Sequence, residues 1–215
     1  MLVFKRERTH PGAVLYGLYL YWMGLSLRCV ADALDPFVKR SHVAVWKWIQ
    51  LFGKNTVFHR RRVTAFLVDE TYIRIGEYDA WVWVAIEPIH RYILGVYLSR
   101  FRNIMVAEFF LRTLVKIYGR HMVYTDEGVW YPDACNSLGL EHRIHTPYEK
   151  SLIERANQYL KDRTESFDDH YPCRRQGCDL SHVRRWLYVF CSMYNEMMRN
   201  RIRFNGLLNL MEVVA

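Results

Sequence analysis

The hydrophobic period of the chain changes at Thr64, and this change constrains the fold more than any other feature. Before it, apolar residues recur every three or four positions, as on one face of a helix. After it, apolar and polar residues alternate in three runs that read as strands with short connections, "TAFLVDETYIRI", "DAWVWVAIEP" and "YILGVYLS". Helix and strand patterns then follow in the order αβαβα. We therefore predict an α/β fold, with one mixed sheet and flanking helices over residues 64–215.

Three helices are expected before the sheet. The longest uncharged run, "PGAVLYGLYLYWMGLSL", is shorter than the roughly 20 apolar residues of a membrane span, so it predicts a buried helix. Ser26 and Ser41 are suitable caps for two further helices. Asp35-Pro36 is expected to end the first of these, and Gly53 the second. The inward-facing residues would be Leu27, Val30, Ala31 and Leu34, then Val45, Trp46, Ile49 and Phe52.

This arrangement predicts a helix-turn-helix module over residues 1–55, joined by a basic linker, 56–63, to the sheet domain. A plain three-helix subdomain would give the same pattern. Lys and Arg number 30 against 22 Asp and Glu, a formal charge of +8, which favours an anionic partner. Five scattered cysteines indicate reduced thiols, and no signal-peptide cleavage site follows the apolar run, so we expect a cytoplasmic protein.

Two acids, Asp69 and Glu70, interrupt the first strand, although strands disfavour acids. Since side chains alternate, Asp69 faces one side of the sheet and Glu70 the other. Asp126 ends the later strand "HMVYTD", and Glu154 lies on the helix "SLIERANQYLKDRT", whose polar face also carries Asn157, Gln158 and Lys161. Three carboxylates suit Mg²⁺ or Mn²⁺. An ordinary surface strand remains the alternative from the residues alone.

Five stretches, in order along nearly the whole chain, resemble one known family: "GLSLRCVADAL" with "HVAVWKWIQ", "VDETYIRI", "YTDEGVWYPDACNSLGLEHRIHT", "IERANQYLKDRT" and "VRRWLYVFCSMYN". The chain resembles the DDE transposases with a ribonuclease-H-like catalytic core, most closely those of the insertion-sequence-six group. The resemblance implies that Asp69, Asp126 and Glu154 bind the metal, with two ions acting in phosphoryl transfer. The chain departs from the family pattern in two ways. The interval between Asp126 and Glu154 is shorter, and Glu127 directly follows the second aspartate.

The function that this resemblance implies is metal-dependent cleavage of DNA at the ends of an insertion sequence, followed by transfer of the freed 3′-OH to target DNA. A transposase-derived DNA-binding protein and a nuclease of the same fold are the alternatives. Synapsis of two ends would require at least a homodimer, acting at the nucleoid. The expected DNA contacts are His42, Ala44 and Lys47 on the Ser41-capped helix, then Arg60, Arg61, Arg62, Lys161 and Arg163 at phosphates.

A second constellation, in the stretch "HYPCRRQGCDLSH", does not belong to this site. His170, Cys173, Cys178 and His182 offer two imidazoles and two thiols, a set that can hold zinc tetrahedrally. Their spacing is not that of a standard zinc finger. We therefore expect a solvent-exposed loop with two free thiols, with a structural zinc site as the alternative.

Overall fold

The computed structural model describes residues 9–56, 58, 61–76, 78–170 and 180–200, and only the backbone of 164–170 and 200. It contains two compact units, and the chain leaves the first after Thr56 and returns to it before Leu180. The helical unit contains α1 (Pro11–Trp22), α2 (Leu27–Leu34), α3 (His42–Asn55) and α7 (Leu180–Asn200). The sheet unit contains five strands and the helices α4, α5 and α6.

The first two turns of the predicted helix pair form as expected. Ser26 Oγ accepts the N–H of Cys29 at 3.2 Å, and Ser41 Oγ accepts the N–H of Ala44 at 3.4 Å, so each serine caps its helix. Helix α2 ends at Leu34, directly before Asp35-Pro36, and buries Val30, Ala31 and Leu34. The predicted limits of α2 are confirmed, and of its four predicted inward residues three are buried and Leu27 is half-buried.

Helix α3 differs from the prediction in which tryptophan it buries. Trp48 is 2% exposed and lies against α1, where a Cβ on Gly17 would be 3.3 Å from the indole. Trp46 is only half-buried, with its ring edge-on to His182 of α7 at 5.2 Å. Because α3 packs on two sides, against α1 and α7, its buried face is wider than a single stripe predicts.

Gly53 does not end α3, which continues to Asn55. The predicted helix end was wrong, because this glycine serves packing instead: a Cβ there would lie 2.1 Å from the carbonyl oxygen of Arg185 in α7. Arg185 Nη1 also lies 3.4 Å from Gln50 Oε1. The compact units thus group the final helix with residues 1–56, whereas the predicted boundaries placed it in the sheet domain.

The sheet unit is built around a mixed sheet of order β3-β2-β1-β4-β5. Its strands are β1 (Ala65–Ile75), β2 (Tyr78–Ile86), β3 (Ile93–Ser99), β4 (Met122–Thr125) and β5 (His142–Ile144). The first three pair antiparallel, whereas β4 runs parallel to β1 and β5 parallel to β4. The predicted α/β class with one mixed sheet is confirmed.

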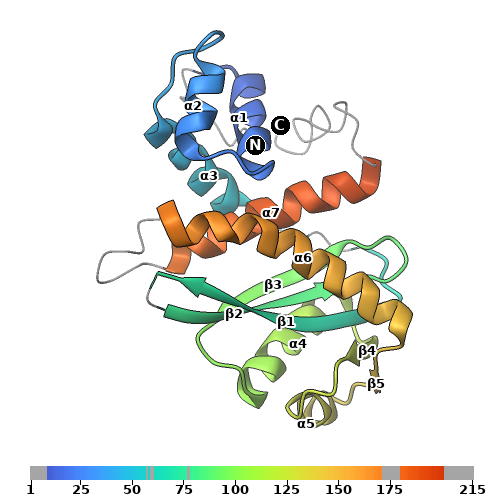
Figure 1. The fold of residues 1–215 in the computed structure, drawn as a ribbon. Coiled ribbons are helices and arrows are strands. Elements are labelled where there is room, and N and C mark those ends of the chain that lie inside the picture. Colours follow the sequence, from blue (N-terminus) through green and yellow to red (C-terminus); the bar gives the residue numbers. More distant parts are fainter. Residues whose placement is uncertain (1–8, 57, 59–60, 77, 171–179, 201–215) are drawn as a thin grey trace. The chain divides into compact units, whose positions relative to one another are not determined.

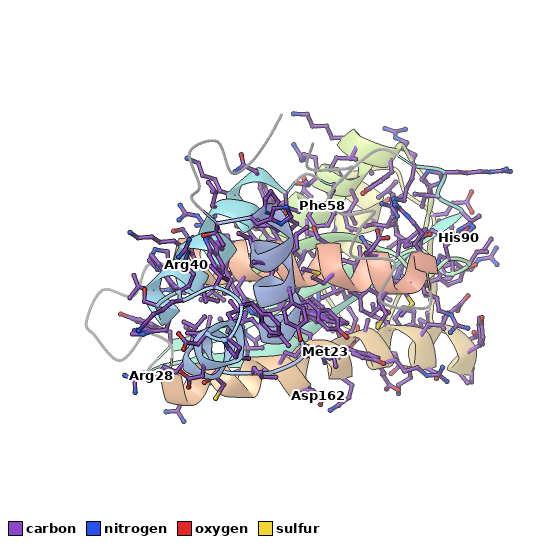
Figure 2. The ribbon with its side chains drawn as sticks, turned by 90° about the horizontal axis from the view of Figure 1, so that it is seen from above. Met23, Arg28, Arg40, Phe58, His90 and Asp162 are labelled. Carbon is purple, nitrogen blue, oxygen red and sulfur yellow. The ribbon has the colours of Figure 1, made fainter. Side chains whose placement is uncertain are left out.

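Helices cover both faces of this sheet (Figure 1). On one face lie α4 (Ile104–Tyr118) and α5 (Tyr131–Ser137), packed on a core that includes Phe66, Val68 and Trp83. On the other lies α6 (Pro147–His170), which contacts β1 and buries Leu152, Ile153, Ala156 and Leu160. Within the described ranges, no helix has the length and apolarity to cross a membrane. Basic side chains such as Arg28 on α2 point outward (Figure 2).

Replacing Gly53 with alanine should destabilise the helical unit. Gly→Ala inside a helix ordinarily stabilises by about 1 kcal/mol, but here the added methyl group meets the α7 backbone, and overpacking of this kind costs about 1–3 kcal/mol. We expect Gly53→Ala to lower the midpoint of urea unfolding followed by circular dichroism.

The control for this prediction is Lys54→Ala, at the adjacent exposed position of the same helix, which should leave the midpoint unchanged. A Gly53→Ala variant as stable as the wild-type chain would show that α3 and α7 do not pack this closely.

Candidate active site

Two of the predicted acids are brought together by the register of two parallel strands. Leu67 of β1 pairs with Tyr124 of β4, and this is the last pair of their ladder. Asp69 and Asp126 each follow two residues later, so they lie level at the point where β4 ends. This is the carboxyl end of a parallel strand, where ligand sites commonly form.

Asp69, Glu70 and Asp126 form an acidic cluster in which one oxygen of each carboxylate lies within 4.8 Å of the others. Glu70 shares the α4/α5 face of β1 with Phe66 and Val68, while Asp69 lies on the α6 face. Because the ladder with β4 stops at Leu67, that edge of β1 has no paired strand beside the acids. Side chains from both faces therefore meet there.

Asp69 is held by two donors. Asn157 Nδ2 of α6 donates to its Oδ2 at 2.7 Å, and the backbone N–H of Glu70 donates to its Oδ1 at 2.9 Å. Burial, followed by repulsion from Glu70 and Asp126, raises the pKa of Asp69 to about 7. A carboxyl with this pKa gives up its proton readily to an incoming cation.

Asp126 is held by the turn that follows it. The N–H of Gly128 donates to Asp126 Oδ1 at 2.9 Å. A Cβ on residue 128 would lie 2.9 Å from that oxygen and 3.0 Å from the Trp130 indole, so glycine is needed here for close approach. Glu127, the departure noted in the sequence, is exposed and takes no part in the acidic cluster.

Two histidines support the same strand end. His142 Nε2 lies 2.7 Å from the hydroxyl of Thr125, which is fully buried and in turn donates to the backbone oxygen of Asp126 at 2.8 Å. His145 Nε2 lies 2.9 Å from the backbone oxygen of Tyr124. Burial lowers the pKa of both histidines, so both are neutral supports of the strand.

Glu154, the third predicted acid, is not part of the acidic cluster. Its side chain is 59% exposed, with Oε1 4.0 Å from Lys150 Nζ. It does line the same pocket as Asp69, an open space of about 480 Å³ between β1 and α6. The residues that line this pocket are Asp69, Glu70, Thr71, Ser151, Glu154, Arg155, Asn157, Gln158 and Lys161. The structure therefore brings the Asp69 and Asp126 carboxylates close together, whereas Glu154 lines the pocket outside the acidic cluster.

Glu70 is the site residue that the sequence analysis left without a role. Its side chain is fully buried, pairs with Arg102 at 2.5 Å and accepts a hydrogen bond from the Tyr131 hydroxyl. Burial raises the pKa of Glu70, although Tyr131 and Arg102 oppose the rise. One signal in the sequence indicates this buried pairing. Glu70 alternates with Phe66 and Val68 on one strand face, and an acid on an apolar strand face requires a buried partner.

The predicted DNA contacts lie in both units. In the helical unit, His42 and Lys47 are exposed on α3, and Ala44 is half-buried in its first turn. In the sheet unit, the Arg61 guanidinium lies 4.4 Å from the centre of the Tyr92 ring, and Arg62 is exposed. Lys161 lines the pocket, and Arg163 Nη1 donates to the Tyr159 backbone oxygen on its own helix at 3.2 Å. Arg60 lies outside the described residues.

The alternative zinc constellation is not tested. Cys173, Cys178 and the side chain of His170 lie outside the described residues. His182 lies on α7, in contact with Trp46.

The donors around Asp69 and Asp126 fit a divalent cation. Three carboxylates this close repel one another, and this repulsion adds to burial in raising the pKa of Asp69. Asn157 is 6% exposed, and its Oδ1 is buried with no hydrogen-bond partner among the described residues, although it lies beside the Asp69 carboxylate. Carboxylate and amide oxygens are ligands of Mg²⁺ and Mn²⁺.

Comparison with known families identifies the chain. Residues 63–198, more than half of the sequence, match the model of the DDE domain of IS240-type transposases. The chain belongs to the DDE transposase family. It is therefore a transposase of the polynucleotidyl-transferase type, and the predicted ribonuclease-H-like core is confirmed. That the first three helices form a DNA-binding helix-turn-helix stays a prediction.

Relatives of this transposase occur in archaea and bacteria. An uncharacterized protein of Methanocaldococcus jannaschii, MJ0017, is 29% identical over 195 residues, which is 90% of each chain. The transposase for insertion sequence-like element IS431mec of Staphylococcus aureus is 25% identical over 173 residues, covering 74% of this chain and 76% of the relative. Both alignments include most of the transposase sequence.

Two solved structures of integrase cores are also similar. The catalytic core domain of BIV integrase aligns with a TM-score of 0.43 and 17% identity, covering 58% of this chain and 80% of its own. The HTLV-2 integrase catalytic core domain in complex with magnesium aligns with a TM-score of 0.46 and 14% identity, covering 69% and 94%. The family assignment depends on the sequence match and not on these likenesses.

The stabilising effect of Mg²⁺ should depend on pH. Without metal, folded Asp69 has a pKa of about 7 against an ordinary 3.8, so between these pH values the folded chain holds a proton that the unfolded chain has lost. The stability contributed by this group therefore falls as pH rises towards 7. Because Mg²⁺ replaces that proton, we expect a larger rise in melting temperature on adding Mg²⁺ at pH 8 than at pH 6.

The control for this measurement is Asp133→Asn, at an exposed acid on α5, which should behave as wild type. Asp69→Asn should abolish the pH dependence of the Mg²⁺ effect. Equal gains for the wild-type chain at both pH values would contradict a metal site built on Asp69.

Proposed function

We propose that this transposase cleaves DNA at the ends of an insertion sequence and transfers the freed 3′-OH to target DNA, with Asp69, Asp126 and Glu154 as its catalytic acids. The observation that carries the proposal is the convergence of Asp69 and Asp126 within 4.8 Å, with the pKa of Asp69 raised to about 7 by burial and repulsion. Acids held together against repulsion are arranged for a cation.

Asp69 and Asp126 would hold Mg²⁺ or Mn²⁺ from two strands, with Asn157 keeping the Asp69 carboxylate turned towards the pocket. A pair of such ions would activate the attacking oxygen and stabilise the leaving one. The chain's own residues bind and orient: buried strand ends fix the two aspartates, and Gly128 fixes the Asp126 carboxylate.

Glu154 would complete the ligand set from α6. It lies three residues before Asn157, so the two side chains start on the same helix face, about 5–6 Å apart at Cβ. Its only described ion pair is the long, exposed contact with Lys150, which is worth little. A rotamer change can therefore bring the Glu154 carboxylate towards Asp69.

DNA would be held by cations around this pocket and on the helical unit. Lys161 follows Glu154 on the same polar face of α6 and lines the pocket, so it would contact a phosphate beside the reacting bond. His42, Ala44 and Lys47 would present the first turns of α3 to the major groove of the element's terminal repeat. Joining two ends requires at least a dimer, and we expect it to act at the bacterial or archaeal nucleoid.

Asp69→Asn and Glu154→Gln should each reduce strand transfer on the order of 10²-fold or more, as expected for the loss of one preorganised charged group at a reaction centre. The assay uses a pre-cleaved element end, a target plasmid and Mg²⁺. Both variants should retain DNA binding, because neither removes a cation.

The matched control is Asp133→Asn, which should retain wild-type strand transfer. Full activity of either site variant would overturn the catalytic assignment. A wild-type chain that cleaves but never joins would indicate a nuclease, and one that only binds DNA would indicate a transposase-derived binding protein.

DNA binding by this transposase should weaken steeply with salt. Each lysine that neutralises a phosphate contributes a slope of about 0.7–0.9 to the fall of log K with log salt concentration. Lys161→Ala should therefore reduce the slope by about one unit, measured by fluorescence anisotropy across a salt series. Lys116→Ala, at an exposed position on α4, should not alter it. An unchanged slope for Lys161→Ala would remove that residue from the phosphate contacts.

A further inference from the structure

Glu70 differs from the other two acids of the cluster because it is fully buried and paired with a cation. Arg102 Nε and Nη2 lie 2.6 Å and 2.5 Å from Oε1, and the Tyr131 hydroxyl donates to Oε2. The Glu70 side chain is fully buried, so neither oxygen has water as an alternative partner. A fully buried carboxylate whose charge is already offset by a guanidinium is poorly placed to bind a second cation, although it lies within 4.8 Å of Asp69 and Asp126.

The partners of Glu70 tie together the two segments that carry the aspartates. Glu70 directly follows Asp69 on β1, while Tyr131 begins α5, five residues after Asp126. Tyr131 is fully buried, with its ring edge-on to Trp83 at 6.0 Å. The Glu70–Tyr131 hydrogen bond therefore links the Asp69 strand to the Asp126 turn through a rigid, buried contact.

Arg102, the second partner of Glu70, is partly exposed but is held by aromatic rings. Its guanidinium lies 4.6 Å from the centre of the Trp81 ring and 4.3 Å from the centre of the Trp130 ring, so it is stacked on two indoles. Trp130 lies within the Asp126 turn, and its ring also limits the space at Gly128. Arg102 therefore contacts both Glu70, which adjoins Asp69 on β1, and Trp130, which lies in the turn after Asp126.

We propose that Glu70 is a positioning residue that, through Tyr131 and Arg102, sets the separation of the Asp69 and Asp126 carboxylates for a divalent cation. The inference rests on the proposed function, since it assumes that these aspartates bind metal. Partners of this kind, which orient ligands without touching the metal, typically change metal affinity 10- to 100-fold.

The test measures Mn²⁺ affinity by electron paramagnetic resonance of the free ion, without DNA or catalysis. Tyr131→Phe removes one hydroxyl from the link and keeps the ring. We expect it to weaken Mn²⁺ binding about 10-fold or more. Glu70→Gln should weaken Mn²⁺ binding comparably. The double variant should bind Mn²⁺ no more weakly than the single variant with the lower affinity, because the two substitutions break the same link.

Tyr118→Phe is the matched control for a buried tyrosine. Its hydroxyl donates to the Leu94 backbone oxygen at 2.7 Å in the same core, away from the acids. It should lower the melting temperature as Tyr131→Phe does, yet leave Mn²⁺ affinity unchanged. Equal losses of affinity in both tyrosine variants would reduce the effect to general destabilisation and overturn the inference.

Two further outcomes separate this inference from the proposed function. If Glu70→Gln weakened binding while Tyr131→Phe matched the wild type, Glu70 would be a ligand and the positioning role would be wrong. If the wild-type chain bound no Mn²⁺, or Asp69→Asn bound it as tightly, the proposed function itself would fail, and this inference with it.

Discussion

Mutual repulsion of carboxylates is the interaction on which this active site depends. Asp69, Glu70 and Asp126 lie within 4.8 Å of one another in a largely buried setting, where like charges are costly. Arg102 offsets the charge of Glu70, but among the described residues no cation pairs with Asp69 or Asp126. The fold thus stores an unfavourable interaction that a divalent cation would reverse, as expected where function takes precedence over stability.

The surrounding structure holds the acids in place against this repulsion. The parallel ladder of β1 and β4 fixes two strand ends at one level, and the apolar core beneath α4 and α5 makes that level rigid. Asn157 reaches Asp69 from α6, and Tyr131 reaches Glu70 from α5, so each face of the sheet contributes one support. The position of the acids is therefore a property of the whole sheet unit.

The features that depend on local pattern and strand order could be predicted from the sequence. The alternation from Thr64 predicted β1 to β3, serine caps predicted α2 and α3, and the resemblance predicted Asp69 and Asp126. The contacts made by tertiary packing could not be predicted from the sequence. Gly53 lies inside α3 because α7 packs on it, and Asn157 is buried rather than exposed because Asp69 accepts its amide. Glu70 faces away from Asp69, as alternation predicts, yet joins the same cluster at the strand edge.

The most direct test of the metal centre is a crystal structure of the transposase grown with Mn²⁺, with anomalous diffraction collected near the manganese absorption edge. The account predicts an anomalous peak between the Asp69 and Asp126 carboxylates, at about 2.0–2.2 Å from an oxygen of each, as for small octahedral divalent ions, with Glu154 turned towards it. A well-diffracting crystal in millimolar Mn²⁺ with no peak at these aspartates, or with its peak at another set of residues, would contradict it.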